Sequence, residues 1–216
     1  MTDHAQTRRV LLIHGLWMPR LSMHWLARRL REAGFATDMF GYPTVAGWPE
    51  ATLPILARRL RERPAHVLAP SLGGLVTLRA LELQPDLPVR RVVCLGSPLR
   101  GSAAAQTLSG QPWGKPYLGR SARLLRSGCQ PWRGPAEVGM VAGRTPMGLG
   151  RYFGRFEGEN DGTVSVDETR LDGLADHVVI PTSHSGMLFS PDALHLAVGF
   201  FRDGRFPARG TVRPIE

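Results

Sequence analysis

The sequence predicts an α/β fold, with a mainly parallel central sheet of about six strands and helices on both of its faces. Apolar runs of strand length alternate along the chain with amphipathic segments of helical period, an order typical of strand, helix, strand units. The strand runs are apolar at consecutive positions, which indicates that both faces of the sheet are covered. The chain has 216 residues, of which 43 % are hydrophobic. This is enough apolar material for one well-packed core, so we expect a single domain over residues 1–216.

Local patterns assign the individual elements. In residues 53–63, leucines recur at helical spacing opposite a face rich in arginine, and residues 89–95 are rich in the β-branched side chains that favour strands. The expected strands are residues 10–13, 35–42, 66–69, 89–95, 138–142 and 177–180. The expected helices are residues 25–34, 53–63, 72–83 and 192–201, with a shorter helical candidate at residues 120–125.

One connection between the expected strands is unusually long. Residues 98–135 are rich in Gly, Pro, Ser and Arg. Connections of this length within a compact domain are uncommon and often serve as lids or binding loops. We therefore expect a lid or cap at residues 98–135, and the alternative is an ordered surface excursion without a function.

Charge and hydropathy limit the partners and the location. The formal net charge is +9, but the arginines fall on expected helix faces and no basic run is interleaved with aromatic residues. We therefore expect no nucleic-acid partner, while peripheral contact with an anionic membrane surface stays open; the oligomeric state is not indicated. The polar residues 1–9 precede an apolar run too short for a signal peptide or a membrane span, so a cytoplasmic location is expected.

The two cysteines do not suggest a metal site. Cys94 lies inside an apolar run and is interpreted as a small buried hydrophobic residue, whereas Cys129 lies in an irregular stretch. Their spacing is not that of metal ligands, and two free thiols are expected, with a disulfide as the alternative.

Ser71 lies where an expected strand gives way to an expected helix, within Ala69-Pro70-Ser71-Leu72-Gly73-Gly74. A nucleophile at such a sharp turn is held in a strained conformation that exposes its hydroxyl, and small residues two positions away let strand and helix approach. Ala69 and Gly73 meet this requirement, and the Leu72 N–H at the helix start can stabilise an oxyanion. The alternative is that Ser71 only caps the helix.

A glycine-containing turn follows the first expected strand, in Ile13-His14-Gly15-Leu16-Trp17. It can present the amide of Leu16 or Trp17 to the same site as a second oxyanion donor. We expect His14 to support this turn structurally.

These motifs resemble the α/β-hydrolase superfamily, most closely the small bacterial lipases and esterases, over roughly residues 9–201. Such enzymes carry a His-Gly turn after the first core strand and a Gly-His-Ser-Leu-Gly-Gly turn at the nucleophile. The stretch from Gly96 to Ser102 is similar to their Gly-Thr-Pro-His-x-Gly-Ser segment. Here Ala69 and Pro70 replace the Gly and His before the serine, and the extended geometry that proline favours suits a strand end.

In this fold an acid and then a histidine follow the serine along the chain. The segment around Asn160-Asp161-Gly162 resembles the acid loop of the lipases, and His184 lies in the polar loop after a late strand, where these hydrolases carry their base. The resemblance therefore implies Asp161 as the acid and His184 as the base. A plain turn is the alternative for residues 160–162. Other candidates are Glu159 and Asp167 for the acid and His177 and His195 for the base.

Ser71, Asp161 and His184 together imply a serine hydrolase that cleaves carboxylic esters through an acyl-enzyme, without a metal or an organic cofactor. Aromatic residues and methionines near loop ends suggest a hydrophobic acyl group and hence a small-molecule or lipid ester substrate. They are Trp17, Met18, Trp25, Trp48, Trp113, Met147 and Met187, of which Trp17 and Met187 are the predicted substrate-binding residues. An acyltransferase or thioesterase with the same triad, or a non-catalytic binding protein on the same scaffold, are the alternatives.

Overall fold

The computed structural model describes residues 7–18, 20–47, 49–112, 114–147 and 158–208. Six strands form one sheet in the order β2-β1-β3-β4-β5-β6, and every neighbouring pair is parallel. The strands are β1 (Arg9–Ile13), β2 (Ala36–Phe40), β3 (Ala65–Pro70), β4 (Val89–Leu95), β5 (Glu137–Gly143) and β6 (Asp176–Ile180). The predicted class and number of strands are confirmed, and no expected strand bound differs from the observed one by more than a few residues.

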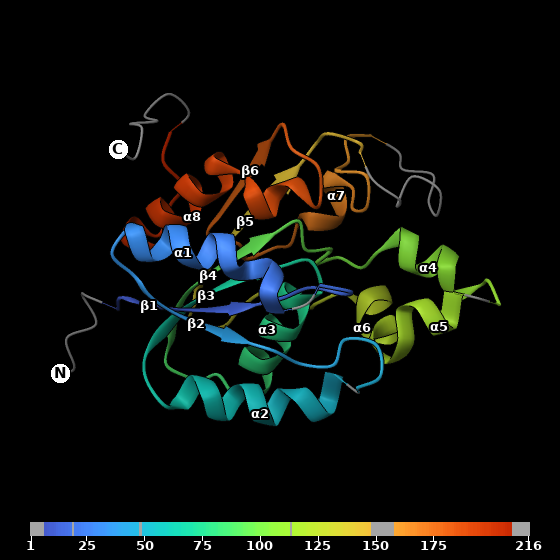
Figure 1. The fold of residues 1–216 in the computed structure, drawn as a ribbon. Coiled ribbons are helices and arrows are strands. Elements are labelled where there is room, and N and C mark those ends of the chain that lie inside the picture. Colours follow the sequence, from blue (N-terminus) through green and yellow to red (C-terminus); the bar gives the residue numbers. More distant parts are fainter. Residues whose placement is uncertain (1–6, 19, 48, 113, 148–157, 209–216) are drawn as a thin grey trace.

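Helices cover both faces of the sheet, as predicted (Figure 1). Helices α1 (His24–Glu32) and α8 (Pro191–Asp203) pack on one face, and α2 (Pro49–Arg61) and α3 (Leu72–Leu83) pack on the other. Smaller helical elements outside residues 98–135 include η2 (Arg20–Met23), α7 (Val166–Thr169) and η5 (Gly186–Phe189). Within the described residues, no helix is long and apolar enough to cross a membrane.

Side-chain alternation along the central strands divides the core into two layers. In β1, Leu11 and Ile13 pack into the apolar layer that also contains residues of α2 and α3, whereas Val10 and Leu12 pack into the layer with α1 and α8. All four side chains are almost completely buried. A strand that is buried on both faces reads as a continuous apolar run, which explains the pattern seen in the sequence.

In the part of residues 98–135 that the structure describes, there are four helical elements instead of the one short helix that was expected. These are α4 (Ala103–Ser109), α5 (Gly114–Leu118), η3 (Gly119–Ser121) and α6 (Ala122–Ser127), and they gather beyond the carboxyl ends of the strands (Figure 1). The Ser121 hydroxyl donates to the Thr44 carbonyl oxygen at 2.6 Å, and the Arg120 N–H donates to the Val45 carbonyl oxygen at 3.1 Å. The described part of this excursion is therefore helical and is bonded to the loop after β2, and its role as a lid or cap stays a prediction.

His66 is a buried histidine at the opposite, amino end of the sheet. Its ring stacks on Phe201 with centroids 4.9 Å apart and meets the edge of Phe35. Burial, helped by the positive charges of Arg91 and Arg90, lowers the pKa of His66 to about 4. The folded protein therefore holds a neutral imidazole there, whereas the unfolded chain would titrate near the ordinary value.

This difference predicts acid destabilisation that starts below pH 6.5. Because the unfolded state binds the proton first, stability is complete above the unfolded pKa and falls between pH 6.5 and about 4, by about 2 kcal/mol at pH 5. In His66→Phe, which keeps a ring against Phe201, urea unfolding at pH 7.5 and pH 5 should show a correspondingly smaller loss. The exposed His24→Gln should lose as much as wild type. An equal loss in His66→Phe and wild type would contradict a neutral His66.

Candidate active site

Ser71 occupies a strained turn between β3 and α3. Its φ is 52° and its ψ is −126°, a conformation that non-glycine residues rarely adopt. The Ser71 N–H donates to the Leu95 carbonyl oxygen of β4 at 2.9 Å, and the hydroxyl makes no capping bond to the helix. The interpretation of Ser71 as a helix cap is therefore contradicted, and the strained turn expected of a nucleophile is present.

The turn at Ser71 depends on residues without side-chain bulk. A Cβ on Gly73 would collide with the carbonyl oxygen of Ile13 in β1, and a Cβ on Gly74 would collide with the Ser97 hydroxyl. Helix α3 thus starts in direct contact with strand β1. Pro70 fits as the last residue of β3, where it pairs with Leu95, so the unusual residue before the serine causes no break in the strand.

Asp161 and His184 form a buried pair. His184 Nδ1 lies 2.7 Å from Asp161 Oδ2, and the Asp161 side chain is 1 % exposed. The other carboxylate oxygen accepts hydrogen bonds from the N–H groups of Thr163 at 2.9 Å and Val164 at 2.7 Å. The His184 N–H also donates to the Asp161 carbonyl oxygen at 2.9 Å. These bonds fix the imidazole with Nδ1 toward the carboxylate and Nε2 directed away from it.

Gly96, directly after β4, brings the serine turn and the Asp161–His184 pair together. It follows Leu95, whose carbonyl accepts the Ser71 N–H, and a Cβ on Gly96 would lie 3.0 Å from Asp161 Oδ2 and 3.2 Å from His184 Nδ1. Both groups therefore flank one backbone turn at the carboxyl edge of the sheet. Across the described ranges, no hydrogen bond joins the Ser71 hydroxyl to His184; in ligand-free enzymes such bonds are often long and shorten with substrate.

The other candidate acids and bases lie in different surroundings. Glu159 pairs with Arg144 at 3.3 Å and Asp167 with Arg170 at 3.6 Å, and both carboxylates are exposed. His177 Nε2 contacts the Thr169 hydroxyl at 2.9 Å. His195 is part of α8. The Asn160 side chain accepts from the Gly162 N–H at 3.0 Å, so residues 160–162 do form a turn, and this turn carries the buried Asp161.

The turn after β1 lies against the nucleophile. A Cβ on Gly15 would be 2.9 Å from Ser71 Cβ, and the Met18 N–H closes the turn on the Gly15 carbonyl oxygen at 3.3 Å. Leu16 occupies the middle of this turn. Leu72 is the first residue of α3, where an N–H group has no partner within the helix. The two predicted oxyanion donors thus lie on the two segments next to Ser71.

His14 supports this turn, in agreement with the sequence analysis. Its Nε2 accepts the Tyr42 N–H at 3.3 Å, so Nδ1 carries the proton and donates to the Gly15 carbonyl oxygen at 3.0 Å. The Tyr42 hydroxyl donates to the His14 carbonyl oxygen at 2.9 Å, and the two rings stack. Burial lowers the pKa of His14, which favours this neutral form.

The two predicted substrate-binding residues differ in exposure. Trp17 is 56 % exposed and has a φ of 57°, so its side chain projects from the turn beside Ser71. Met187 is buried, and its Cε packs against Gly96 and Gly143 beneath the Asp161–His184 pair. Their contact with substrate stays a prediction. Trp48 and Trp113 lie outside the described residues.

Glu168 is a residue near the site that the sequence analysis missed. Its carboxylate accepts the N–H of Ser165 at 2.8 Å and that of Ala103 at 2.5 Å. It therefore joins the segment that follows Asp161 to the start of helix α4. Burial raises the pKa of Glu168, while these hydrogen bonds act in the opposite direction. The Ser165-x-x-Glu168 spacing is that of a helix capping box and could have identified it.

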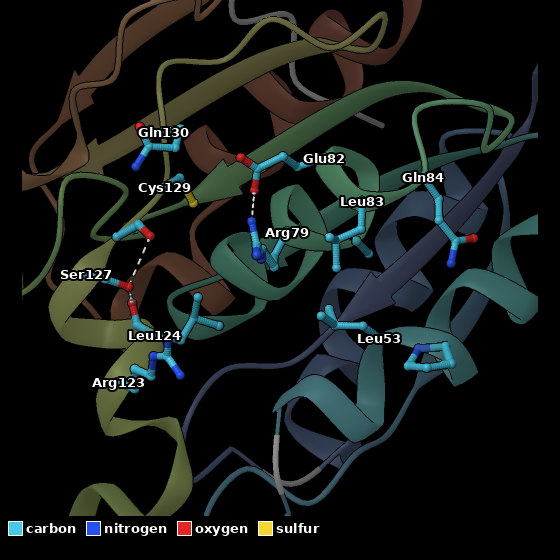
Figure 2. Close-up of a pocket in the computed structure, with 13 residues that line it drawn as sticks. Leu53, Arg79, Glu82, Leu83, Gln84, Arg123, Leu124, Ser127, Cys129 and Gln130 are labelled. Atoms are coloured by element: carbon cyan, nitrogen blue, oxygen red, sulfur yellow. Dashed lines mark hydrogen bonds and ion pairs between the residues drawn. The ribbon is translucent and has the colours of Figure 1, made fainter.

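A cavity of about 490 Å³ lies away from this site, between α2, α3 and α6 (Figure 2). Leu53, Arg79, Arg123 and Cys129 are among its lining residues, and none of the three predicted catalytic residues is. Cys94 and Cys129 are free thiols, as expected. The residues that the structure describes include no cluster of His, Cys, Asp and Glu able to hold a metal ion.

Comparison with known proteins identifies the fold. No protein-family model and no curated protein matches the sequence. A Bacillus licheniformis lipase in its mature form has a TM-score of 0.72 and 21 % identity, with 86 % of this chain and 88 % of the lipase covered. In its propeptide form the TM-score is 0.77 at 18 % identity, with 98 % of this chain covered but only 54 % of the lipase.

Two further solved structures extend this likeness. A metagenomic carboxyl esterase has a TM-score of 0.64 and 18 % identity, with 86 % of this chain and 66 % of the esterase covered. The NocB thioesterase domain, solved as a covalent complex with a fluorophosphonate, has a TM-score of 0.60 and 17 % identity, with 92 % and 94 % covered. With its six parallel strands and helices on both faces, the chain has the α/β-hydrolase fold of bacterial lipases and esterases.

Proposed function

We propose that this chain is a serine hydrolase that cleaves carboxylic esters, with Ser71 as nucleophile, His184 as base and Asp161 as the acid that orients the base. The observation that carries the proposal is the buried Asp161–His184 hydrogen bond of 2.7 Å beside the strained Ser71 turn. A carboxylate buried this deeply needs partners, and three N–H groups supply them: two from the backbone and one from the imidazole.

The first half of the reaction forms the acyl-enzyme. His184 Nε2 takes the Ser71 hydroxyl proton while the oxygen attacks the acyl carbon, and the carboxylate stabilises the resulting imidazolium. The amides of Leu72 and Leu16 would donate to the oxyanion of the tetrahedral intermediate, each contributing about 3 kcal/mol. The intermediate collapses when the imidazolium gives its proton to the leaving alcohol.

The second half releases the acid and regenerates the serine. His184 takes a proton from water, the hydroxide attacks the acyl carbon, and a second tetrahedral intermediate forms in the same oxyanion site. Its collapse returns the proton to the Ser71 oxygen and frees the carboxylic acid. The residues supply all the proton transfers, so the proposed mechanism needs no metal or organic cofactor.

We further propose a hydrophobic acyl group and a small-molecule or lipid ester. The supporting observation is the exposed Trp17 indole, which projects from the turn that contacts Ser71. The helical cap of residues 98–135 lies beyond the same edge of the sheet and would cover an acyl chain there (Figure 1). In this proposal Met187 shapes the floor of the site.

A thioesterase is the second candidate, because a thioesterase domain is among the structures with the same fold. Thioesters and oxyesters pass through the same acyl-enzyme, so the two activities differ in the leaving group alone. Transfer to an alcohol in place of water would need the same residues. Product analysis with an added alcohol acceptor separates transfer from hydrolysis.

Ser71→Ala should abolish ester hydrolysis. Removal of a catalytic serine typically lowers kcat by about 10⁵- to 10⁶-fold, which here means a fall to background. The measurement is p-nitrophenyl ester hydrolysis over acyl chains from short to long, and the chain length of highest kcat/KM reports the size of the site. The exposed Ser127→Ala is the matched control. Full turnover in folded Ser71→Ala would exclude Ser71 as the nucleophile, and thioester turnover without oxyester turnover would select the thioesterase.

Asp161→Asn tests the orienting acid. The amide keeps the shape of the side chain but removes its charge and changes the favoured imidazole tautomer, so we expect kcat to fall by about 10³- to 10⁴-fold with little change in KM. Glu159→Gln, in the same loop but exposed and paired with Arg144, should stay within about twofold of wild type. A larger loss in Glu159→Gln than in Asp161→Asn would reverse the assignment.

Tyr42→Phe tests the support of the oxyanion turn. It removes the hydroxyl that donates to the His14 carbonyl oxygen but keeps the ring stack, so the free energy of unfolding should fall by about 1 kcal/mol. A looser turn should lower kcat more than it changes KM, because the Leu16 amide acts on the transition state. Steady-state kinetics and urea unfolding of the same sample separate the two effects. An unchanged kcat despite lost stability would assign Tyr42 to packing alone.

A further inference from the structure

The segment of residues 96–103 runs from the end of β4 to the start of α4 and touches the surroundings of Asp161 at both of its ends. At one end, a Cβ on Gly96 would lie 3.0 Å from Asp161 Oδ2. At the other end, the N–H of Ala103 donates to the carboxylate of Glu168, in the short helix α7 that follows Asp161 along the chain. Glu168 therefore fixes the second of two contacts between these segments.

A tight turn over residues 160–165 determines where the Asp161 carboxylate lies. The Asp161 N–H donates to the Val164 carbonyl oxygen at 3.0 Å, and Asn160 pairs with Ser165 in an antiparallel bridge. The Val164 N–H in turn donates to the Asp161 carboxylate at 2.7 Å. Because the turn is closed by these bonds, a shift of its last residue, Ser165, would move the carboxylate as well.

The Glu168 side chain holds that last residue. Its Oε2 accepts the Ser165 N–H at 2.8 Å, and its Oε1 accepts the Ala103 N–H at 2.5 Å. The Glu168 carbonyl oxygen also accepts the Arg100 N–H at 2.9 Å. A helix capping box requires only the bond to Ser165. The bond to Ala103 is an additional one, and it joins residues that lie 65 positions apart in the chain.

We propose that Glu168 is a positioning residue of the ester-cleaving site, an inference that rests on the proposed function. Its two bonds fix the turn around Asp161 against the start of α4 and thereby hold the carboxylate against His184 Nδ1. Glu168 acts through Asp161 and touches neither the nucleophile nor the substrate. The carboxylate matters most when His184 carries the proton, in the transition state, so a displaced Asp161 lowers kcat and leaves KM nearly unchanged.

Ala103→Pro removes the N–H donor and leaves Glu168 in place. Ala103 is the first residue of α4, where proline is favoured, and Ser102 already has the extended backbone that a following proline requires, with φ −111° and ψ 118°. The Ala103 side chain is exposed. We expect kcat for p-nitrophenyl esters to fall by roughly 10- to 100-fold, with KM within about twofold of wild type. Ala103→Ser keeps the N–H and should match wild type.

Two variants of Glu168 separate its hydrogen bonds from its charge. Glu168→Gln keeps the length but turns an NH₂ group toward one of the two backbone donors, and Glu168→Asp keeps the charge but is one methylene shorter. Both should lower kcat, whereas Asp167→Asn, an exposed neighbour paired with Arg170, should stay within about twofold of wild type. Added to Ala103→Pro, Glu168→Gln should cause little further loss, because its NH₂ group can take the side that has lost its donor.

The Nδ1 proton of His184 gives a readout that does not depend on turnover. Its NMR resonance is displaced downfield by the hydrogen bond to Asp161, so its position reports that bond. In the Ser71→Ala background and without substrate, the resonance should move in Ala103→Pro and stay in place in Ala103→Ser. Thermal unfolding of the same samples shows that the variants are folded.

Several outcomes would overturn the positioning role. They are an unchanged kcat in folded Ala103→Pro, a higher KM at unchanged kcat, and a fall in kcat with an unmoved His184 resonance. A loss in Glu168→Gln that Glu168→Asp does not share would do the same, since it would assign the effect to charge. A wild type that cleaves no ester would refute the proposed function instead. The resonance then decides alone: the positioning stands if the resonance moves in Ala103→Pro and falls if it does not.

Discussion

The contact between the first turn of α3 and the end of β1 is the constraint on which the rest of the site depends. Because Gly73 lies against the Ile13 carbonyl, the chain must turn sharply at Ser71 and adopt a positive φ there. Such a conformation costs about 1 to 3 kcal/mol and persists only where the surroundings enforce it. Here α3 is buried between the sheet and α2, and Leu72, Leu75 and Val76 are fully covered. Packing of the helix therefore offsets the strain at the serine.

The parallel arrangement of the strands then determines which loops lie close to Ser71. The carboxyl ends of β3, β4, β5 and β6 meet at one edge, so the loops after them converge although they are far apart along the chain. Asp161 tolerates burial at this edge because both carboxylate oxygens are occupied. Glu168 adds a constraint of its own, since its carboxylate ties the segment after Asp161 to the beginning of α4. The position of Asp161 is therefore linked to the first helix of residues 98–135.

The fold and the sharp turn at Ser71 could be predicted because their signals are local, whereas Asp161 and His184 were expected together only from the family resemblance. Strand runs such as residues 89–95 are apolar and rich in β-branched residues, and the pattern that predicts the turn at Ser71 lies within residues 69–74. Other features depend on distant contacts. Helix α2 begins at Pro49 and runs through Pro54, where the local signal favours a break, because its apolar face packs on α3. Helices α4 and α5 are short, and their apolar residues, such as Leu108, are recognisable only once they are packed on the core.

The histidines of this chain show that residue type alone does not indicate what a side chain does, because buried histidines occur in several parts of the fold. His14, His66 and His177 all have a pKa lowered by burial, so each is held neutral, yet they serve different parts of the fold. The described contacts of His184 include the buried Asp161 carboxylate, 2.7 Å from its Nδ1. Some arginines likewise have a structural role. Arg91 and Arg202 donate to carbonyls at the ends of α8 and α1, which gives part of the +9 charge a structural role.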